Sequence, residues 1–550
     1  MTLLYRNLSV ALEDAAGDLT PLVARKLRVA PEKVVVRDIV RRSIDARKGR
    51  PPRYLFTVAV ELPAEIEATL LRKSLPNIER FERAPVVSVP SVPAADSGRR
   101  RPVIIGAGPA GLFAAYRLAQ AGVPGIVVER GLPVLERSIQ WNGFLKGKQT
   151  FDPESNLLFG EGGAGTYSDG KLYTRVHDER APEVLRVLAE CGAPDEILYE
   201  GKPHVGSNLL PSIIRRLREW LIAHGIEFRF STRMTGIELD GRELRAIRVR
   251  ARADGEGSGD SESGIECDTL FLGLGHSARD TLRMLHASGI RMERKPFQIG
   301  ARVEHPQRVV DAMQYGESAG HPQLPPADYR LVAKRRTGDV FSFCMCPGGE
   351  ILPATEKAGF ICVNGASRFK RIGDFANSGF VMTLEPEEFG RAASDVLAGL
   401  ALQEQIESKA ARIATHPFGA PALRLVDFLE GRTSIDLPPT SYPLPLTSAP
   451  FAEFLPGQLL ASLREGLDDL CRRIPLFRDP EAIIVGPESR SSSPVRIVRD
   501  AETLESPSAR GLYPMGEGAG FAGGILSAAI DGMHCAERYL ARITAGGGAQ

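Results

Sequence analysis

The sequence lacks several features that would each point to a particular class of protein. It has only seven cysteines in 550 residues, an odd number with no secretory signal before them, so neither a disulfide framework nor secretion is expected. No stretch of about 18 or more residues is uninterruptedly apolar, so no transmembrane helix is expected. The formal net charge is only +1, which favours neither nucleic acid nor a membrane surface as a partner. These absences predict a protein of the reducing cytoplasm.

Several catalytic signatures are also missing. There is no HExxH motif and no cluster of cysteine and histidine at metal-ligand spacing, so we expect no metal. No cysteine pair of the disulfide-reductase type lies near residues 161–171. No second GxGxxG turn follows Gly111, because the turn at 273–276 lacks the third glycine. If NAD(P)H is an electron donor, it is therefore expected to bind transiently, without a Rossmann domain of its own.

Length and changes of pattern divide the chain into several parts. At 550 residues it is too long for one compact core. From residue 101 the pattern becomes strand, glycine turn, helix and strand, with a later β-meander at 234–268 whose tip at 254–264 is expected to be flexible. Beyond it come short strands, many prolines and a few helices, such as one at 386–414. We predict a small N-terminal α+β domain at 1–84, a Pro-, Ser- and Ala-rich linker at 85–99, the first part of a dinucleotide-binding domain at 100–290, a substrate domain at 291–478 and the second part of the dinucleotide-binding domain at 479–545.

The N-terminal part is predicted to be a small α+β sandwich with helices on one face of a sheet. Its expected elements are strands at 3–12, 33–41 and 53–62 and helices at 19–29 and 64–73. A basic cluster lies between the two later strands and consists of Arg41, Arg42, Arg47, Lys48, Arg50 and Arg53. It is either a solvated hairpin or a contact for an anion, RNA or a protein partner, and both interpretations stay open.

A glycine turn, GAGPAG at 106–111, follows a short β-branched run and opens a helix. That is the context in which GxGxxG binds a dinucleotide. Gly106 permits the tight turn, Gly108 leaves the backbone open to a pyrophosphate, and Gly111 lets the helix pack on the strand. Glu129 lies 23 residues after Gly106, at the end of the next strand, where a carboxylate accepts hydrogen bonds from the adenosine ribose. The alternative is a glycine turn that serves packing alone.

The C-terminal region distinguishes FAD from NAD. The segment GLYPMGEGAG at 511–520 precedes a glycine pair and a helix at 525–539. It resembles the second FAD motif of glutathione-reductase-like flavoproteins, in which a strand ends in Gly-Asp or Gly-Glu. The resemblance implies that Glu517 binds the ribityl hydroxyls. It also implies that the helix N-terminus points at the N1/C2=O edge of the flavin, where negative charge builds on reduction.

Two further glycine-rich segments fit the same class. LFGEGGAGTYSDGKL at 158–172, the glycine-dense loop, resembles the loop that wraps the FAD phosphates and flavin in fumarate-reductase-like flavoproteins, and the turn at 273–276 resembles their turn after the meander. Residues 100–545 as a whole most resemble a family of uncharacterised FAD-dependent dehydrogenases or oxidoreductases, distantly like the fumarate-reductase and glutathione-reductase flavoproteins. Besides the loop, the closest segments are 341–349, 487–497 and 515–532. The resemblance implies an α/β fold with a glutathione-reductase-like, Rossmann-type FAD-binding domain and an inserted α+β substrate domain.

The motif and the resemblances together predict FAD as the cofactor and a set of residues that contact it. Arg137 is included because it follows the second strand and is expected to reach a phosphate. The set is Gly106, Gly108, Pro109, Ala110, Gly111, Glu129, Arg130, Arg137, Gly162, Gly163, Thr166, Ser168, Asp169, Gly275, Gly516, Glu517, Gly523, Gly524 and Ile525.

The catalytic candidates are Cys344 and Cys346, in the strand-like segment VFSFCMCPGG. Alternation along a strand places the two cysteines on one face and the bulky Phe341, Phe343 and Met345 on the other. The small face would then line a cavity over the flavin, where one thiol acts as a proton donor or a nucleophile. The alternative is that both cysteines are buried as small hydrophobes. A disulfide between them is not expected, since positions i and i+2 of a strand lie about 6.5–7 Å apart at Cα.

Five other residues are weaker candidates. His416 precedes a proline and is either a structural turn residue or a base. Arg490 and Arg496 flank a serine run and either bind a substrate carboxylate or the cofactor, or anchor the crossover between domains. Lys171 and Tyr167 belong to the glycine-dense loop and are placed to approach the ring.

Together these patterns predict an FAD-dependent oxidoreductase, a dehydrogenase or reductase, that passes hydride or electrons through flavin to or from a small-molecule substrate. The alternative is a flavin-bearing interaction or RNA-modification factor whose basic N-terminal domain recruits a partner. A closed apolar cavity would favour the enzyme. A continuous basic surface from Arg41 to Arg53 would favour the alternative.

Overall fold

The computed structural model describes residues 2–47, 49–82, 92, 99–174, 177–252, 261–335, 338–390, 392 and 395–546. Most of the predicted linker at 85–99, Lys48 of the basic cluster and residues 254–260 of the predicted meander tip lie outside these residues.

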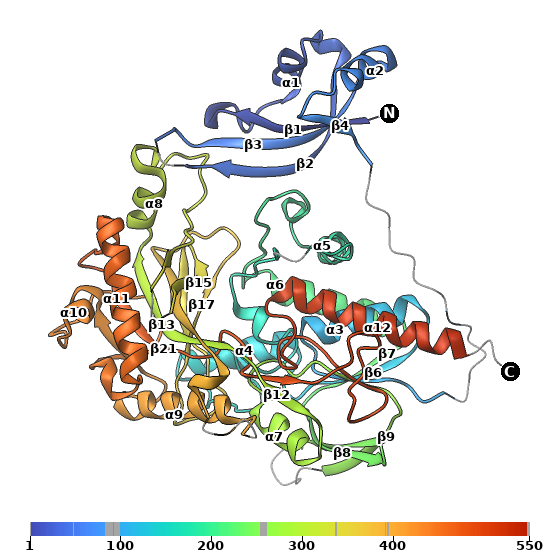
Figure 1. Ribbon diagram of the computed structural model, residues 1–550, viewed down its shortest axis with the longest axis vertical. Helices are drawn as coiled ribbons and strands as arrows, with labels where there is room; N and C mark the ends of the chain where they lie inside the picture. Colours follow the sequence, from blue (N-terminus) through green and yellow to red (C-terminus); the bar gives the residue numbers. More distant parts are fainter. Residues whose placement is uncertain are drawn as a thin grey trace.

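The N-terminal unit is a four-stranded sheet in the order β2-β3-β1-β4, with both of its helices on one face (Figure 1). Alternate residues such as Leu8, Val10, Phe56 and Val58 are buried beneath the helices, which is the period-two pattern that predicted these strands. The short β4 had no clear signal in the sequence. The elements are β1 (Thr2–Val10), α1 (Thr20–Leu27), β2 (Val35–Asp45), β3 (Arg53–Glu61), α2 (Ala64–Arg72) and β4 (Ile78–Arg80).

The dinucleotide-binding domain is built on a five-stranded parallel sheet in the order β23-β11-β5-β6-β7. The last strand of the chain, β23, pairs with β11, so residues near 105 and near 514 are parts of one sheet, as the Rossmann-type prediction requires. Figure 1 shows α12 lying alongside α3. Its elements are β5 (Val103–Ile105), α3 (Pro109–Gln120), β6 (Gly125–Val128), α4 (Val134–Leu145), α5 (Ala181–Glu190), α6 (Leu210–Ala223), β7 (Ile226–Arg229), β11 (Leu270–Leu272), β23 (Leu512–Pro514) and α12 (Ile525–Gly546).

The predicted meander forms a three-stranded antiparallel sheet, β10-β9-β8. Its strands, with the helix that follows β11, are β8 (Thr232–Asp240), β9 (Glu243–Ala251), β10 (Ser261–Glu266) and α7 (Arg279–Ala287). The predicted flexible tip extended too far, because residues 261–264 pair with β9 as part of β10. Backbone pairing overrides the polar, Ser- and Glu-rich composition there.

The remaining unit is a seven-stranded sheet in the order β14-β15-β18-β13-β21-β19-β20, flanked by two small two-stranded sheets, β12-β22 and β16-β17. One face of β13 packs Ile299, Ala301 and Val303 in a core that includes residues of α11. The elements are β12 (Met292–Arg294), β13 (Phe297–Pro306), α8 (Gln307–Tyr315), β14 (Val332–Ala333), β15 (Val340–Cys346), β16 (Gly349–Pro353), β17 (Val363–Ser367), β18 (Phe375–Leu384), α9 (Ala398–Ile413), β19 (Ala420–Arg424), α10 (Leu425–Glu430), β20 (Leu446–Ser448), α11 (Gly457–Arg473), β21 (Ile483–Glu488) and β22 (Val495–Ile497).

Two predictions for this region differ from the structure. The predicted helix at 386–414 begins only at Ala398, since Gly390 has a positive φ of 88° that no α-helix accommodates. The predicted boundary at 478 cuts through the seven-stranded sheet, because β21 lies between β13 and β19. Its residues are buried throughout, as expected of a central strand, and the chain leaves this sheet only after Glu488.

Candidate functional site

The glycine turns meet at the carboxyl edge of the parallel sheet. Ile105, Val128, Leu272 and Pro514 lie side by side as the last residues of their strands. The turns that follow these strands are therefore neighbours in space. In open α/β sheets this edge is where ligands bind.

The three glycines of the first turn have different physical roles. Gly106 has a φ of 93°, and a Cβ on it would collide with Gly273 O. A Cβ on Gly111 would collide with Gly106 O, so both glycines are required by packing. Gly108 differs, because a Cβ there would find only Gly163 Cα, at 3.9 Å. Gly108 also stands immediately before α3, whose N-terminus has no side-chain cap. The turn therefore presents open backbone and a helix N-terminus, as a pyrophosphate requires.

The Glu129 carboxylate accepts hydrogen bonds from the first glycine turn and from the start of the glycine-dense loop. Its Oε2 accepts from Ala107 N at 2.8 Å, and its Oε1 accepts from Gly131 N and Gly160 N, both at 3.0 Å. A carboxylate has about four acceptor sites, so these bonds are compatible with an additional ribose hydroxyl. The neighbouring Arg130 is engaged with Glu154 at 2.8 Å and Asp280 at 3.0 Å.

Arg137 is fully buried and shapes the glycine-dense loop from inside. Its guanidinium donates to Asn156 O and Glu161 O at 2.7 Å and to Gly163 O at 3.0 Å. Its Nη2 has no hydrogen-bond partner among the described residues, so the predicted phosphate contact stays a prediction. Burial raises the pKa of the adjacent Glu161 to about 7. Glu161, which sequence reasoning missed, accepts from Val134 N at 2.7 Å at the start of α4.

The glycine-dense loop also contacts the unit built on the seven-stranded sheet. Gly162 and Gly163 have positive φ values of 84° and 63°, and Ser168 Oγ donates to Gly165 O at 2.8 Å within the loop. Asp169 is buried and pairs with Arg371 at 2.7 Å and Lys171 at 3.3 Å. Burial opposes its ionisation, but these two cations outweigh burial and hold the pKa of Asp169 well below its ordinary value. Ser168 and Asp169 thus serve loop structure and domain contact.

The second FAD motif lies against the first. A Cβ on Gly516 would lie 2.9 Å from Ala110 Cβ, and one on Gly518 would collide with Gly275 O. Glu517 Oε1 accepts from Ser493 N at 2.8 Å, and burial raises the pKa of Glu517. The pair Gly523-Gly524 ends immediately before α12, whose first residue is Ile525. The predicted members of this motif therefore gather at the same edge of the sheet.

Sequence reasoning missed the residues that hold this second motif. Asp531 accepts from Gly516 N and from Arg499, both at 2.7 Å, and Arg499 lies 3.6 Å from the centre of the Phe521 ring. Gly532 packs against α3, because a Cβ there would collide with Ala110 O. Their signal in the sequence is the adjacent pair Asp531-Gly532, which interrupts the apolar pattern of the predicted C-terminal helix.

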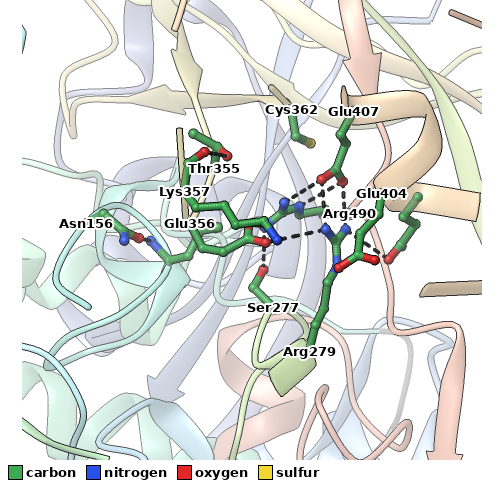
Figure 2. Close-up of polar contacts among 12 residues, drawn as sticks. Asn156, Ser277, Arg279, Thr355, Glu356, Lys357, Cys362, Glu404, Glu407 and Arg490 are labelled. Atoms are coloured by element: carbon green, nitrogen blue, oxygen red, sulfur yellow. Dashed lines mark hydrogen bonds and ion pairs between the residues drawn. The ribbon is translucent and has the colours of Figure 1, made fainter. Parts of the chain in front are cut away.

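A buried ion network joins the dinucleotide-binding domain to the unit built on the seven-stranded sheet (Figure 2). The Glu407 carboxylate on α9 forms ion pairs with Arg279 at 2.7 Å and with Arg490 at 2.6 Å. Arg490 also pairs with Glu356. Burial opposes the charge of Glu407, but the two arginines outweigh it and keep the pKa of Glu407 well below its ordinary value. Of the two predicted roles of Arg490, the structure supports the anchor of the crossover. Arg496 pairs with Glu293 at 3.1 Å on the surface.

The predicted alternation of β15 breaks at the cysteines. Cys344 has a positive φ of 45°, and the pairing of β15 with β18 shifts between Phe343 and Cys346. Before the bulge Phe343 pairs with Gly379, and after it Cys346 pairs with Asn377. Because Gly379 and Asn377 are two residues apart and lie on one face of β18, Cys346 lies on the same face of the sheet as Phe343. Cys346 is fully buried, as the small-hydrophobe alternative expects, and Cys344 is half-buried.

Two cations and the Cys346 thiol bond the backbone at Cys344 and Met345. Arg302 donates to Cys344 O at 3.2 Å, the Cys346 thiol donates to the same carbonyl at 3.2 Å, and Lys171 Nζ donates to Met345 O. Interaction between the two thiols, together with the cations Lys171 and Arg302, outweighs burial and lowers the pKa of the Cys344 thiol. Arg302 is fully buried and pairs with Glu488 at 2.6 Å, and burial raises the pKa of Glu488 to about 7.

The other candidates lie in ordinary structural roles. Tyr167 OH bonds Ser138 Oγ at 2.7 Å, and the exposed His416 bonds Thr415 Oγ1 at 3.1 Å. The basic cluster is partly neutralised, since Arg42 pairs with Glu200 and Arg47 with Asp45. Within the described ranges no group of three or more His, Cys, Asp or Glu is placed to hold a metal ion. In that same part of the chain, no helix is both long and apolar enough to cross a membrane.

The sheet order and the paired glycine turns define a Rossmann-type flavoprotein. Residues 296–491 match the family described as "FAD-dependent protein, C-terminal domain-like", and residues 4–61 match a "Domain of unknown function (DUF8436)". An uncharacterised protein of Clostridium beijerinckii is 38% identical over 544 residues, covering 98% of this chain and 99% of that protein. The chain therefore belongs to this family of FAD-dependent proteins, and its cofactor is FAD.

Looser likenesses are found among solved structures. A geranylgeranyl bacteriochlorophyll reductase-like protein from Thermoplasma acidophilum is 11% identical, with 81% of this chain and 79% of that chain covered and a TM-score of 0.35. A variant of the quinol fumarate reductase of E. coli is 12% identical, with 82% and 71% covered and a TM-score of 0.36.

Proposed function

We propose that the protein is an FAD-dependent oxidoreductase, a dehydrogenase or reductase, with a small-molecule substrate. The substrate site lies where the glycine-dense loop meets β15. The observation that carries the proposal is the junction formed by Lys171 of the loop and Met345 of the strand, with the half-buried Cys344 beside it. A positive φ at a non-glycine residue costs free energy, and such strain is concentrated at functional sites.

The residues that would hold FAD are those gathered at the carboxyl edge of the parallel sheet. Gly108 and the start of α3 would receive the pyrophosphate, Glu129 the ribose, and Glu517 with the start of α12 the flavin end. Bound FAD supplies two-electron chemistry, and NAD(P)H is the candidate transient donor.

Cys344 would act as the proton acceptor for a substrate that is being oxidised, and would return the proton in the reverse direction. Its lowered pKa keeps the thiol ionised near neutral pH, which favours acceptance of a proton over donation. Lys171 and Arg302 would stabilise the thiolate before the proton arrives. Asp169 would position Lys171 through their 3.3 Å ion pair.

The test is anaerobic reduction of the purified protein with NADH, NADPH and dithionite, followed by reoxidation with a panel of carbonyl, enone and quinone acceptors. With an acceptor that works, Cys344→Ser should keep its flavin but slow reoxidation by about tenfold or more, the cost of a lost general acid or base. Cys346→Ser is the matched control, because it makes the same change at the neighbouring, fully buried cysteine. It should slow reoxidation less than Cys344→Ser does. Equal rates for both variants and the unaltered protein would remove Cys344 from the reaction.

A further inference from the structure

A pocket of about 340 Å³ lies between the N-terminal unit and the dinucleotide-binding domain. We call it the β2 pocket. Its wall includes Val40 and Arg41 of β2, Tyr173, Leu185 of α5, Leu198, and Leu526 in the first turn of α12. The volume is at the lower end of the range for small-molecule sites.

The N-terminal unit is fixed against this pocket by direct backbone pairing. Arg42 N donates to Tyr199 O, and Gly201 N donates to Arg42 O, both at 2.7 Å. The Arg42 guanidinium pairs with Glu200 and stacks 5.3 Å from the centre of the Tyr199 ring. Strand β2 is an edge strand of its sheet, so this pairing covers an edge that would otherwise be free.

Gly201 shows how closely the strand approaches. A Cβ on Gly201 would lie 3.2 Å from Arg42 O and 3.1 Å from Ser43 Cβ. The N-terminal unit is therefore a built wall of the pocket and not a loosely tethered neighbour.

The charge around the pocket is unbalanced. Two acids line it, but Glu200 is paired with Arg42, and Asp178 is paired with Arg180 at 3.0 Å. Arg41 has no ion-pair partner among the described residues, and a Cβ on Gly201 would lie 3.5 Å from its Nε. The rest of the wall is largely apolar, and Leu198 and Tyr173 remain 47% and 41% exposed, so the pocket offers apolar surface near the Arg41 guanidinium.

We propose that the β2 pocket binds a small organic anion with an apolar, preferably aromatic, body. The anionic group lies against Arg41 and the body against Leu198 and Leu185. The N-terminal unit thus completes a second ligand site on the molecule, separate from the glycine turns. This site does not depend on which substrate the flavin reduces or oxidises.

The test compares two probes of nearly the same shape on the full-length holoprotein by equilibrium dialysis. Anilinonaphthalene sulfonate carries an anionic group, and N-phenyl-1-naphthylamine does not. The unaltered protein should bind one sulfonate per chain. Arg41→Gln should weaken sulfonate binding by about fivefold, the order expected for one partly exposed charge pair, and leave the neutral probe unchanged.

Two further variants locate the effect. Arg28→Gln removes an exposed charge of the same domain that does not line the pocket, and it should leave both probes unchanged. Leu198→Asp should weaken both probes, because it removes apolar contact, and should weaken the sulfonate more, by about tenfold, because it also adds a like charge. The proposal is overturned if the sulfonate does not saturate at one site, if Arg41→Gln binds it normally, or if Arg28→Gln loses as much affinity.

Discussion

At the scale of single residues, glycines divide into those required by packing and those that leave space. Gly106 and Gly111 face backbone atoms, whereas Gly108 faces almost none. A sequence shows which positions are glycine but not which of these reasons applies, since that depends on turns far away in the chain, such as Gly163 and Gly273.

Gly108→Val should abolish flavin retention while the chain still folds. The backbone at Gly108 is extended, with φ −80° and ψ −178°, so valine is accommodated there, but its side chain enters the space left for the pyrophosphate. Gly457→Val is the matched control, because its Cβ would likewise collide with nothing and it lies far from the turn. Flavin absorbance per chain after desalting gives the comparison. A Gly108→Val protein that is as yellow as the control would refute the assigned pyrophosphate position.

Cys344 should be the most readily alkylated of the described cysteines at mildly acidic pH. Its pKa is lowered, so its thiolate persists as the pH falls below neutrality. Burial has the opposite effect on other thiols: it raises the pKa of Cys362 to about 11 and that of Cys535 well above its ordinary value. Iodoacetamide at about pH 6, followed by peptide mass spectrometry, measures this. Preferential labelling of another cysteine would contradict the lowered pKa.

At the scale of elements, periodicity predicted most of the parallel sheet, the meander and the N-terminal sandwich. It failed where a residue conformation interrupts the period. Alternation was wrong at Cys344 because of the bulge, and the helix predicted from 386 was wrong because of Gly390. The central strand β21 was assigned to the wrong unit, since the identity of a strand's neighbours is a tertiary property that local pattern does not contain.

The buried network around Glu407 should make the contact between α7, α9 and the crossover sensitive to acid. Glu407→Gln should destabilise the protein by about 3–5 kcal/mol near pH 7, because two buried arginines lose their shared carboxylate. The folded-state pKa is depressed below the ordinary value of 4.5. The extra free energy of unfolding that Glu407 gives the unaltered protein is therefore fully present above about pH 4.5. It is lost as the pH falls through the folded-state pKa.

Thermal unfolding midpoints measured from pH 7 down to about pH 2 cover the range in which this difference should shrink. Glu404→Gln on the same helix is the control, since Glu404 pairs with Arg283 in a more exposed contact. A Glu407→Gln difference that does not shrink as the pH falls below 4.5 would show that the carboxylate's charge is not its source.

At the scale of the whole molecule, one parallel sheet is built from segments far apart in the sequence, since β5 and β23 both pair with β11. We expect a chain beginning near Ser97 to retain FAD, because the glycine turns and the ion network all belong to later residues. The same deletion should remove the wall of the β2 pocket. A chain ending before Gly511 should lose FAD, since β23 and α12 complete the site. Loss of flavin from the N-terminal deletion would mean that the first unit supports the cofactor site.

The central claim is that this FAD is a redox group and not a structural one. The most direct measurement is an anaerobic dithionite titration of the purified protein, with chromatographic identification of the released cofactor. The account predicts FAD, full bleaching by two electrons per chain, and recovery of the original spectrum when a competent acceptor is added. Release of FMN, or an FAD whose absorbance dithionite does not bleach, would contradict it.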